Sequence, residues 1–261
     1  MRSDVQVGLT VVALAWRERE QLARCFASLR PLVELTGAPT LIVLDADADA
    51  VTAKIARQVA QQVITNTFEN FSRQRNLALD SVPTEWTFFI DADERMTRAL
   101  ASDIAARLQS GTDAAYRVPR RNILFGKEVR HTGWWPDYQV RLLQTARCRY
   151  DESRGVHEVP DVRGSIGTLS SPLTHFNYET WGQFISKQRS YAPLEARALH
   201  AAGKEARLRS FVGQPAREFK RRFIDYRGYK DGPLGLGLSL AMSAYKLLTY
   251  WHLYRLGKRP G

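Results

Sequence analysis

Short apolar segments alternate with amphipathic segments over the first 95 residues, and this alternation constrains the fold more than any other feature. The apolar segments are typical of buried strands, and the segments between them are typical of helices. The predicted strands are residues 7–14, 41–44, 63–64 and 86–90, and the predicted helices carry Leu22, Cys25, Phe26 and Leu29 or span 49–61 and 71–79. The pattern predicts an α/β fold with a mostly parallel central sheet and helices on both faces.

The character of the sequence changes after a predicted helix at 97–109. Residues 114–178 hold short β-like runs separated by loops rich in Gly, Pro and Arg, and the chain becomes helical and basic from about residue 180. We therefore expect a domain of residues 1–178, made of an α/β half (1–96) and an irregular β-rich half (97–178). A helical C-terminal region follows at 179–261.

Carboxylates follow the strand predicted at 86–90, in the sequence Asp91-Ala-Asp93-Glu94. In open α/β sheets, ligands bind outside the carboxyl ends of the strands. Two Asp residues one position apart on a turn can both face a hard cation, and a divalent metal with a diphosphate is the usual reason for carboxylates there. The alternative is a polar turn in which Asp93 or Glu94 caps the helix that starts near Thr97.

Two other predicted strands also end at acidic side chains, Glu18 after the first and Asp45 after the second. Parallel topology would bring these carboxylates to one rim of the sheet, which favours a site for a nucleotide and a metal. Neither G-x-G-x-x-G nor G-x-x-x-x-G-K-[ST] occurs in the sequence, which argues against a dinucleotide dehydrogenase and a P-loop NTPase. A metal would then have to carry the phosphate charge.

The chain is basic, with 38 Lys and Arg against 27 Asp and Glu and a net charge of +11. This charge suggests an anionic partner, which is nucleic acid, anionic lipid or a phosphorylated substrate. Two cysteines are too few for a disulfide framework and fit a reducing compartment. The apolar run near the N-terminus reads as a strand rather than a signal peptide, and no run of 18 apolar residues predicts a membrane span.

Residues 204–261 hold 13 Lys and Arg against 4 Asp and Glu, so this segment supplies most of the net charge. A basic segment (217–230) precedes an apolar one (233–248), which ends in the aromatic and basic residues at 250–255. This order fits a helix lying in an anionic membrane interface. The alternative is a helix packed on the core with a solvated basic face. Lys246, inside the apolar segment, argues against a full membrane span.

An ordered set of motifs resembles the inverting glycosyltransferases of family 2, which have the Rossmann-like GT-A fold. The motifs are the first strand with Glu18 behind it, the strand ending in Asp45, Arg73-Gln-Arg-Asn-Leu-Ala-Leu79 and Phe89-Ile-Asp-Ala-Asp-Glu-Arg95. Three more motifs, Pro119-Arg-Arg-Asn122, His131-Thr-Gly-Trp-Trp-Pro-Asp-Tyr-Gln-Val-Arg-Leu-Leu143 and Val156-His-Glu158, resemble the subgroup that builds lipopolysaccharide core or similar bacterial envelope glycans. The resemblance covers nearly the whole chain.

The resemblance implies a nucleotide pocket in residues 1–96. Glu18 and Asp45 match positions that hold the base and ribose, and Arg75 and Asn76 match an Arg-Asn pair that lines the same pocket. The chain departs from the family in two places. It has Ala15-Trp-Arg-Glu18 where members usually have Thr-Lys-Asn-Glu, and Asp45-Ala-Asp-Ala-Asp-Ala50 where they have Asp-Ser-x-Ser-x-Asp. These departures leave the identity of the nucleotide open.

The resemblance also implies a metal motif at Asp91 and Asp93. Asp93 is the expected direct ligand of a Mg²⁺ or Mn²⁺ ion that bridges the diphosphate, and Asp91 is expected to contact both nucleotide and metal. His157 could be a third metal ligand or could orient the diphosphate, with His131 and His175 as rivals. Zinc is not expected, because neither C-x-x-C nor H-E-x-x-H occurs.

Asp137 is the candidate general base. Inverting transfer needs a carboxylate that takes the proton of the acceptor hydroxyl, and Asp137 matches the family position of that base. The alternative is an Asp that closes a Pro-Asp turn. Trp134 and Trp135 precede it and could stack on a sugar. Downstream on one strand face, Gln139 and Arg141 could contact acceptor or diphosphate, although Arg141 could instead pair only with an acidic neighbour.

The sequence thus predicts a metal-assisted inverting glycosyltransferase with a nucleotide-sugar donor, a UDP-sugar being favoured. The expected acceptor is a lipid-linked or phosphorylated glycan, and the expected location is cytoplasmic, peripheral on the inner face of the cytoplasmic membrane. No nucleic-acid partner is expected. The alternatives are a nucleic-acid-binding basic protein, which would need a recognition motif absent from the sequence, and a metal-dependent sugar nucleotidyltransferase, which normally has a Gly-rich, Lys-bearing N-terminal loop.

Overall fold

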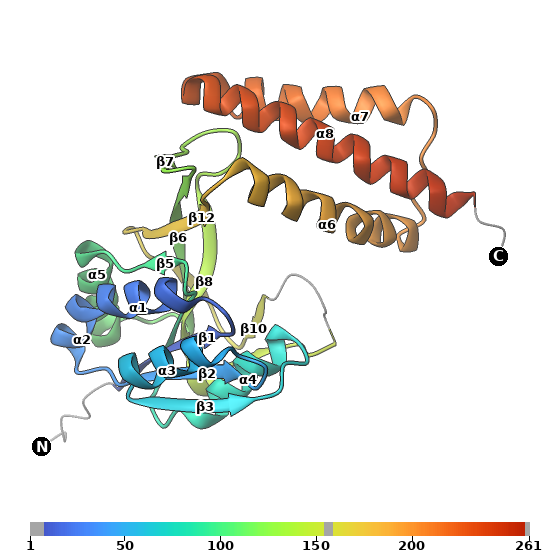
Figure 1. Ribbon diagram of the computed structural model, residues 1–261. Coiled ribbons are helices and arrows are strands. Elements are labelled where there is room, and N and C mark those ends of the chain that lie inside the picture. The colour runs from blue at the N-terminus through green and yellow to red at the C-terminus, as the bar shows by residue number, and fades with distance from the viewer. Residues whose placement is uncertain (1–7, 154–158, 259–261) are drawn as a thin grey trace, which may run out of the picture. The chain divides into compact units, whose positions relative to one another are not determined.

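The computed structural model describes residues 8–153 and 159–258. These residues fall into two compact units (Figure 1). The first unit contains residues 8–120 and 138–175, and the second contains residues 121–137 and 176–258. Strands β6 (Ala115–Leu124), β8 (Asp137–Gln144) and β12 (Leu173–Tyr178) each have residues in both units.

The first unit begins with an alternation of strands and helices, as the sequence predicts. Its strands include β1 (Leu9–Ala15), β2 (Thr40–Asp45), β3 (Gln62–Asn66), β4 (Trp86–Ile90), β5 (Glu94–Arg95), β9 (Cys148–Tyr150), β10 (Pro160–Val162) and β11 (Ile166–Thr168). Its helices are α1 (Arg19–Ser28), α2 (Arg30–Thr36), α3 (Ala50–Val59), α4 (Phe71–Ser81) and α5 (Arg98–Ser110), and a short 3₁₀ turn spans Thr145–Arg147. The predicted strands and helices of residues 7–110 are therefore confirmed as elements, with ends shifted by a few residues.

The main sheet has the strand order β3-β2-β1-β4-β8-β6-β12-β5. The first four strands are parallel, with Val11 opposite Thr40 on β2 and Phe88 on β4. Strand β8 then joins antiparallel to β4, with Leu142 opposite Phe88. Because β1, β2 and β4 run in the same direction, the loops that follow them emerge at one edge of the sheet.

Both faces of the sheet are buried. On β1, Val11 and Ala13 pack into a core cluster with α1, α2, α3 and α5, whereas Val12 packs into a second cluster with α4. Side chains alternate between the faces of a strand, so a strand covered on both sides is a continuous apolar run. This burial explains why the sequence 9–15 carries almost no polar residue.

Thr97 caps α5, since its hydroxyl accepts a hydrogen bond from the backbone N–H of Leu100. The alternative of a cap by Asp93 or Glu94 is therefore wrong. Glu94 begins β5, a two-residue strand that pairs antiparallel with β12 and places His175 opposite Glu94. The sequence did not predict β5, because two residues carry no periodicity.

The second unit consists mainly of helices. They are α6 (Trp181–Ala201), α7 (Ser210–Phe219) and α8 (Gly232–Gly257), with a π-helical turn at Lys220–Asp225 and a 3₁₀ turn at Gly228–Asp231 before α8. Helix α8 contacts both α6 and α7 (Figure 1). Its residues Leu238 and Met242 pack with Leu124, Tyr178 and Phe184 in the core of this unit.

Residues 121–137 belong to this second unit and include β7 (Lys127–Glu128). Asp231 anchors the segment, because its carboxylate accepts hydrogen bonds from the backbone N–H of His131 at 2.9 Å and lies 2.9 Å from the ring nitrogen Nδ1. Arg222 donates to the carbonyl of Thr132 at 2.7 Å. The sequence places 121–137 with the β-rich half, so this association with the helices is a new finding.

Among residues 8–153 and 159–258, no helix is both long and apolar enough to cross a membrane. Lys246, the charge inside the apolar segment of α8, forms an ion pair with Glu195 of α6. The pair lies in the contact between the two helices, and its members are 24% and 30% exposed.

Candidate active site

A cavity of about 390 Å³ opens at the carboxyl ends of β1 and β2 in the first unit. Its lining is Leu14, Ala15, Trp16 and Glu18 after β1, Val43, Asp45 and Asp47 after β2, and Phe68, Phe71 and Gln74 around the start of α4. Three aromatic rings and three carboxylates thus surround one space. Such a mixture suits a nucleoside, whose flat base packs on aromatic rings while its hydroxyls need acceptors.

The two predicted nucleotide carboxylates both line this cavity, and each is held by backbone of its own loop. Glu18 Oε2 accepts from the N–H groups of Trp16 at 2.6 Å and Arg17 at 2.8 Å. Asp45 Oδ1 accepts from the N–H of Asp47 at 2.8 Å. These bonds fix one oxygen of each carboxylate and leave the other for a ligand. Convergence of the first two strand ends is therefore seen in the structure.

The aromatic part of the cavity comes from Trp16, Phe68 and Phe71, which are 45%, 42% and 51% exposed. The rings of Phe68 and Phe71 meet edge to face with centroids 4.9 Å apart. Large exposed aromatic side chains beside carboxylates are a mark of a binding surface rather than of a core. None of the three was predicted from the sequence, although the Phe68-x-x-Phe71 pair directly after a short predicted strand was a usable signal.

The predicted Arg-Asn pair lies away from the lining of this cavity, as far as the described residues show. Asn76 bonds to the backbone N–H and carbonyl of Tyr150, both at 2.9 Å, and so ties α4 to β9. Arg75 lies over the rings of Phe89 and Tyr150 and approaches Asp91 at 3.5 Å. Their contact with a nucleotide stays a prediction.

Asp91, at the end of β4, is paired with arginines. Arg141 of β8 donates to both of its carboxylate oxygens, and Arg75 approaches from α4. Burial opposes ionisation of Asp91, but the guanidinium groups of Arg141 and Arg75 outweigh it and hold the pKa well below its usual range. Asp91 is therefore a fixed anion whose oxygens already have partners.

Glu94 contacts both the backbone at Asp91 and two arginines of this cluster. Its side chain is fully buried, and it accepts from the backbone N–H of Asp91 at 2.9 Å, from Arg141 at 2.6 Å and from Arg120 at 3.4 Å. Burial raises the pKa of Glu94, while the two guanidinium groups oppose that effect. One carboxylate thus fixes both the turn that carries Asp91 and the arginine that binds it. From the sequence, the only specific role predicted for Glu94 is that of an alternative helix cap.

Asp93 differs from Asp91 because no arginine pairs with it among the described residues, although the two side chains are similarly exposed, at 42% and 36%. The imidazole Nε2 of His175, on β12, lies 3.3 Å from Asp93 Oδ2. His175 itself is only 8% exposed, so its ring is positioned by the sheet. The structure thus brings together an accessible carboxylate and one of the two histidines weighed as rivals to His157.

This pair has the chemistry that Mg²⁺ or Mn²⁺ accepts, since these ions take carboxylate oxygens and Mn²⁺ also takes imidazole. Mg²⁺ at phosphate sites usually keeps one or two protein carboxylates, with the remaining positions filled by phosphate oxygens and waters. Within the described ranges, no group of three or more His, Cys, Asp or Glu side chains is arranged to hold a metal ion. His157 lies outside the described residues, and His131 is engaged with Asp231 in the second unit.

Arg141 shows one of the two roles considered for it, the pairing with acidic neighbours. Its side chain is 4% exposed, and its Nε atom is buried without a hydrogen-bond partner among the described residues. Gln139 lies half-buried two residues earlier on β8, and Tyr138 is exposed with the Arg117 guanidinium 4.7 Å from its ring centre. Contact of Gln139 or Arg141 with an acceptor or diphosphate stays a prediction.

Asp137 is the first residue of β8, and in its own unit it is held by Asn122. The Asn122 amide donates to Asp137 Oδ2 at 3.3 Å and to the carbonyl of Trp134 at 2.9 Å. Asn122 is fully buried, so this loop is anchored rather than loose. The ring of Trp134 packs against Tyr178 and Phe184 in the core, whereas Trp135 is 40% exposed. Of the two tryptophans, Trp135 is the more available for a sugar.

The chain is similar to known glycosyltransferases. The model of glycosyl transferase family 2 matches residues 10–157. The lipopolysaccharide core biosynthesis glycosyltransferase LpsC of Rhizobium meliloti is 24% identical over 254 residues, which are 95% of this chain and 92% of LpsC. An uncharacterized glycosyltransferase of Rickettsia felis is 22% identical over 199 residues, 72% of this chain and 69% of that protein.

Among solved structures, the mannosyltransferase PcManGT from Pyrobaculum calidifontis, in complex with GDP-Man and Mn²⁺, has a TM-score of 0.56. It is 11% identical, and the likeness covers 96% of this chain and 88% of that one. At such low identity the likeness speaks for the fold, and it confirms the predicted fold class.

Proposed function

The chain belongs to glycosyl transferase family 2, and from this membership we propose that it moves a sugar, with inversion, from a nucleotide diphosphate to a lipid-linked or lipopolysaccharide-core glycan. As a member of the family it is a glycosyltransferase that uses a nucleotide-sugar donor. The predicted family resemblance is thereby confirmed. The similarity to LpsC along nearly the whole chain supports an acceptor of the lipopolysaccharide core.

The observation that carries the proposal is the contrast between Asp91 and Asp93. Arg141 and Arg75 already neutralise Asp91, whereas Asp93, which is similarly exposed, lies beside the His175 imidazole and has no arginine partner among the described residues. We assign Asp93 and His175 as the residues that would hold a divalent cation, and Mn²⁺ in the PcManGT complex supports a metal of this kind. When bound, the cation supplies charge neutralisation on the leaving diphosphate. The Asp91 carboxylate then serves to hold the guanidinium groups of Arg141 and Arg75.

The nucleoside is assigned to the 390 Å³ cavity. Phe68, Phe71 and Trp16 provide aromatic surface for the base, and Glu18 and Asp45 each have an oxygen available for hydroxyl or ring N–H donors. Holding the donor in this way orients its anomeric carbon, which contributes to catalysis by reducing the entropy loss on reaching the transition state. A UDP-sugar is the donor we favour.

Asp137 is proposed as the general base. The acceptor oxygen forms the new bond to the anomeric carbon, its proton passes to the Asp137 carboxylate, and the bond from that carbon to the diphosphate oxygen breaks. Asn122 holds one carboxylate oxygen of Asp137. The residue directly precedes Tyr138, where β8 enters the first unit. Asp137 and Arg141 therefore belong to the same strand, β8, which supports Asp137 as the base.

The basic helical region is proposed to hold the enzyme at an anionic membrane surface, on the cytoplasmic side where nucleotide sugars are made. A lipid-linked acceptor is confined to the membrane, so an enzyme that acts on it gains from a location there. The excess of 13 Lys and Arg over 4 Asp and Glu in residues 204–261 supports this location.

A thermal-shift screen tests the proposal. The full chain is melted with UDP-, GDP-, ADP- and CMP-sugars, with and without Mn²⁺, and we expect one nucleotide class to raise the midpoint only when metal is present. Turnover is then followed for Asp137→Asn and for the matched control Asp161→Asn, an exposed carboxylate on β10. We expect a loss of about 10²–10⁴-fold for the first and none for the second. Absence of any shift, or full activity of Asp137→Asn, would overturn the assignment.

A further inference from the structure

Two peptide planes meet at the Cα atom of Asp93, and a hydrogen bond holds each of them. The plane before it carries the carbonyl of Ala92, which accepts from the Arg95 guanidinium at 2.8 Å. The plane after it carries the N–H of Glu94, which donates to the carbonyl of Asp91 at 2.9 Å. Because a residue has only two soft backbone dihedrals, holding both planes fixes the direction in which the Asp93 side chain leaves the backbone.

Arg95 is itself held at two more points. The nitrogen that bonds to Ala92 also donates to the carbonyl of Glu94 at 2.8 Å, and the other terminal nitrogen donates to the side-chain oxygen of Gln21 on α1. The planar guanidinium presents its donors in a fixed fork, so Gln21 determines how the fork is oriented. We call these contacts of Arg95 with Ala92, Glu94 and Gln21 the Arg95 clamp.

Two further side chains of α1 contact the same segment of backbone. Cys25 Sγ donates to the carbonyl of Asp91 at 3.4 Å, and Ser28 Oγ accepts from the N–H of Met96 at 3.0 Å. Gln21, Cys25 and Ser28 are four and three residues apart, which places them on one face of the helix. Helix α1 lies beside β5 (Figure 1). The segment from Asp91 to Met96 is therefore attached along one face of α1.

Helix α1 also begins directly behind the nucleoside cavity. The backbone N–H of Gln21 donates to the carbonyl of Glu18 at 2.8 Å, and Trp16 and Glu18 line the cavity. Gln21 thus contacts the cavity loop through its backbone, and it contacts Arg95 through its side chain. One helix connects the part of the donor site assigned to the nucleoside with the turn assigned to the cation.

We propose that Arg95 is a positioning residue of the donor site, held in place by Gln21. It acts through the backbone on either side of Asp93 and directs that carboxylate to the place beside His175 where the cation would bind. The inference deepens the proposed function and rests on it for the cation. The Arg95 clamp itself can be tested without metal or donor.

Hydrogen exchange of the full chain, without metal and without donor, tests the clamp. The amide of Glu94 is followed by NMR relative to that of Val12, at the centre of the sheet, which reports on global unfolding. We expect exchange at Glu94 to become about tenfold faster in Arg95→Met and in Gln21→Leu, because charge-assisted hydrogen bonds are lost. Gln21→Glu, which keeps an acceptor for the guanidinium, should resemble wild type.

The matched control is Arg98→Met, at an exposed arginine in the first turn of α5. It removes the same charge three residues further along the chain, and exchange at Glu94 should stay as in wild type.

Affinity for Mn²⁺, measured by electron paramagnetic resonance in the presence of UDP, tests the effect on the cation. Arg95→Met should weaken Mn²⁺ binding about 10–100-fold, the usual range for groups that orient a metal ligand. Arg95→Lys should recover part of this loss, and Arg98→Met should show none. Binding of uridine, which carries no phosphate, should stay as in wild type, because Arg95 is not among the residues that line the nucleoside cavity.

Three outcomes would overturn the proposal. One is unchanged exchange at Glu94 in Arg95→Met. Another is equal acceleration at Glu94 and Val12, which would mean that Arg95 only adds global stability. The third is weaker Mn²⁺ binding with unchanged exchange, which would mean that the guanidinium contacts the diphosphate directly.

The proposed function fails by a different result. If wild type bound no Mn²⁺ and transferred no sugar, the cation assignment would be refuted, and with it the effect of Arg95 on a cation. Faster exchange at Glu94 in Arg95→Met would still show that Arg95 fixes the turn.

Discussion

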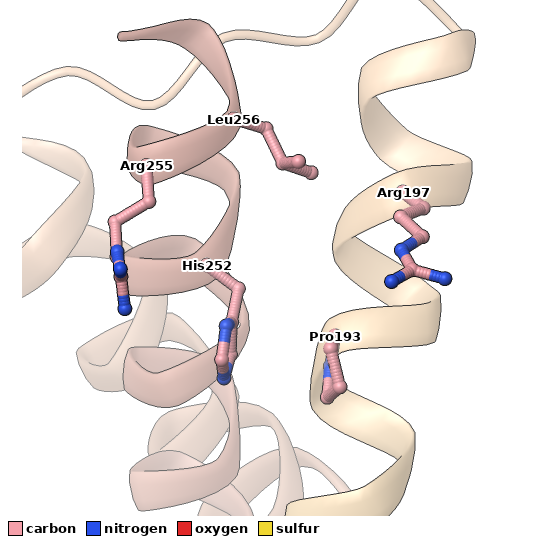
Figure 2. A pocket seen from close by; sticks show the side chains of 5 residues that line it. All are labelled: Pro193, Arg197, His252, Arg255 and Leu256. Atoms are coloured by element: carbon pink, nitrogen blue, oxygen red, sulfur yellow. The ribbon is translucent and has the colours of Figure 1, made fainter. Parts of the chain in front are cut away.

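In the first unit, Arg75, Arg120 and Arg141 turn inward onto Asp91 and Glu94, whereas in the second unit Arg197 of α6 and Arg255 of α8 (Figure 2) are exposed and form no ion pair within the described part of the chain. Buried cations that already have partners hold neighbouring groups in place. Exposed cations without such partners can bind an anion from solution. Part of the positive charge of the first unit therefore has a structural role, whereas the exposed cations of the helical region are available to an anionic partner.

The largest effect is expected from Asp93, the carboxylate of the Asp-Ala-Asp motif that has no arginine partner in the described part of the chain. Asp93→Asn should lower kcat/KM for sugar transfer by about 10³-fold or more, because the leaving diphosphate loses its charge partner. The thermal midpoint should stay near that of wild type, since the side chain is 42% exposed. Asp161→Asn is the control, and near-normal transfer by Asp93→Asn would contradict the metal assignment.

Removal of the buried carboxylate should affect stability most. Glu94→Ala leaves two guanidinium groups short of a partner and should lower the free energy of unfolding by about 3–5 kcal/mol. Urea denaturation measures the change. Glu20→Ala, which removes an exposed i,i+4 pair with Arg24, should change it by less than about 1 kcal/mol. An equal loss in the free energy of unfolding for the two substitutions would show that the buried ion pairs of Glu94 contribute no more to stability than an exposed pair.

A smaller change is expected in the nucleoside cavity. Phe71→Ala should raise the donor KM about tenfold with kcat nearly unchanged, because stacking of a base on an aromatic ring contributes about 1–3 kcal/mol. Steady-state kinetics with the preferred donor measure this effect. Leu35→Ala, at an exposed apolar residue of α2, should leave KM as it is. A fall in kcat alone would place Phe71 outside the binding surface.

The smallest effect concerns acid stability of the second unit. Burial opposes ionisation of Glu218, but hydrogen bonds from Arg221 and Arg222 outweigh it and lower the pKa of this carboxyl. Its stabilisation is therefore present above the ordinary pKa of Glu and is lost as the pH falls through the lower folded value. Glu218→Gln should cost about 1–3 kcal/mol at pH 7 and much less at pH 3.

Thermal melts between pH 7 and pH 3 measure this difference. Glu205→Gln, at an exposed position, should follow wild type throughout. Parallel pH profiles for Glu218→Gln and wild type would show that Arg221 and Arg222 do not lower the pKa of the Glu218 carboxyl.

Much of the first unit follows from sequence periodicity. Strands such as β1 and β4 are continuous apolar runs, and the positions of Glu18, Asp45 and Asp91 follow from parallel topology. The role of Glu94 does not, because its arginine partners lie 26 and 47 residues further along the chain. Pairing over such distances depends on how β6 and β8 are placed in the sheet. Likewise β12, which brings His175 to Asp93, has no local signal for that contact.

The second unit was less predictable for a different reason. Helix α8 is apolar on most of its circumference, so the sequence alone does not show which face is buried and which is exposed. Contacts with α6, α7 and β6 decide that, and they select Leu238 for the core and Leu240 for the surface. The ion pair of Lys246 with Glu195 also fixes which side of α8 contacts α6.

The buried contact between Glu94 and Arg141 has a consequence for how this chain can change over generations. If either residue were replaced alone, an uncompensated charge would remain inside the sheet, and a lineage carrying it would be selected against. Replacement of both by apolar residues would pass through that disfavoured intermediate. We therefore expect positions 94 and 141 to vary together, so that a collection of relatives would show either both charges or neither.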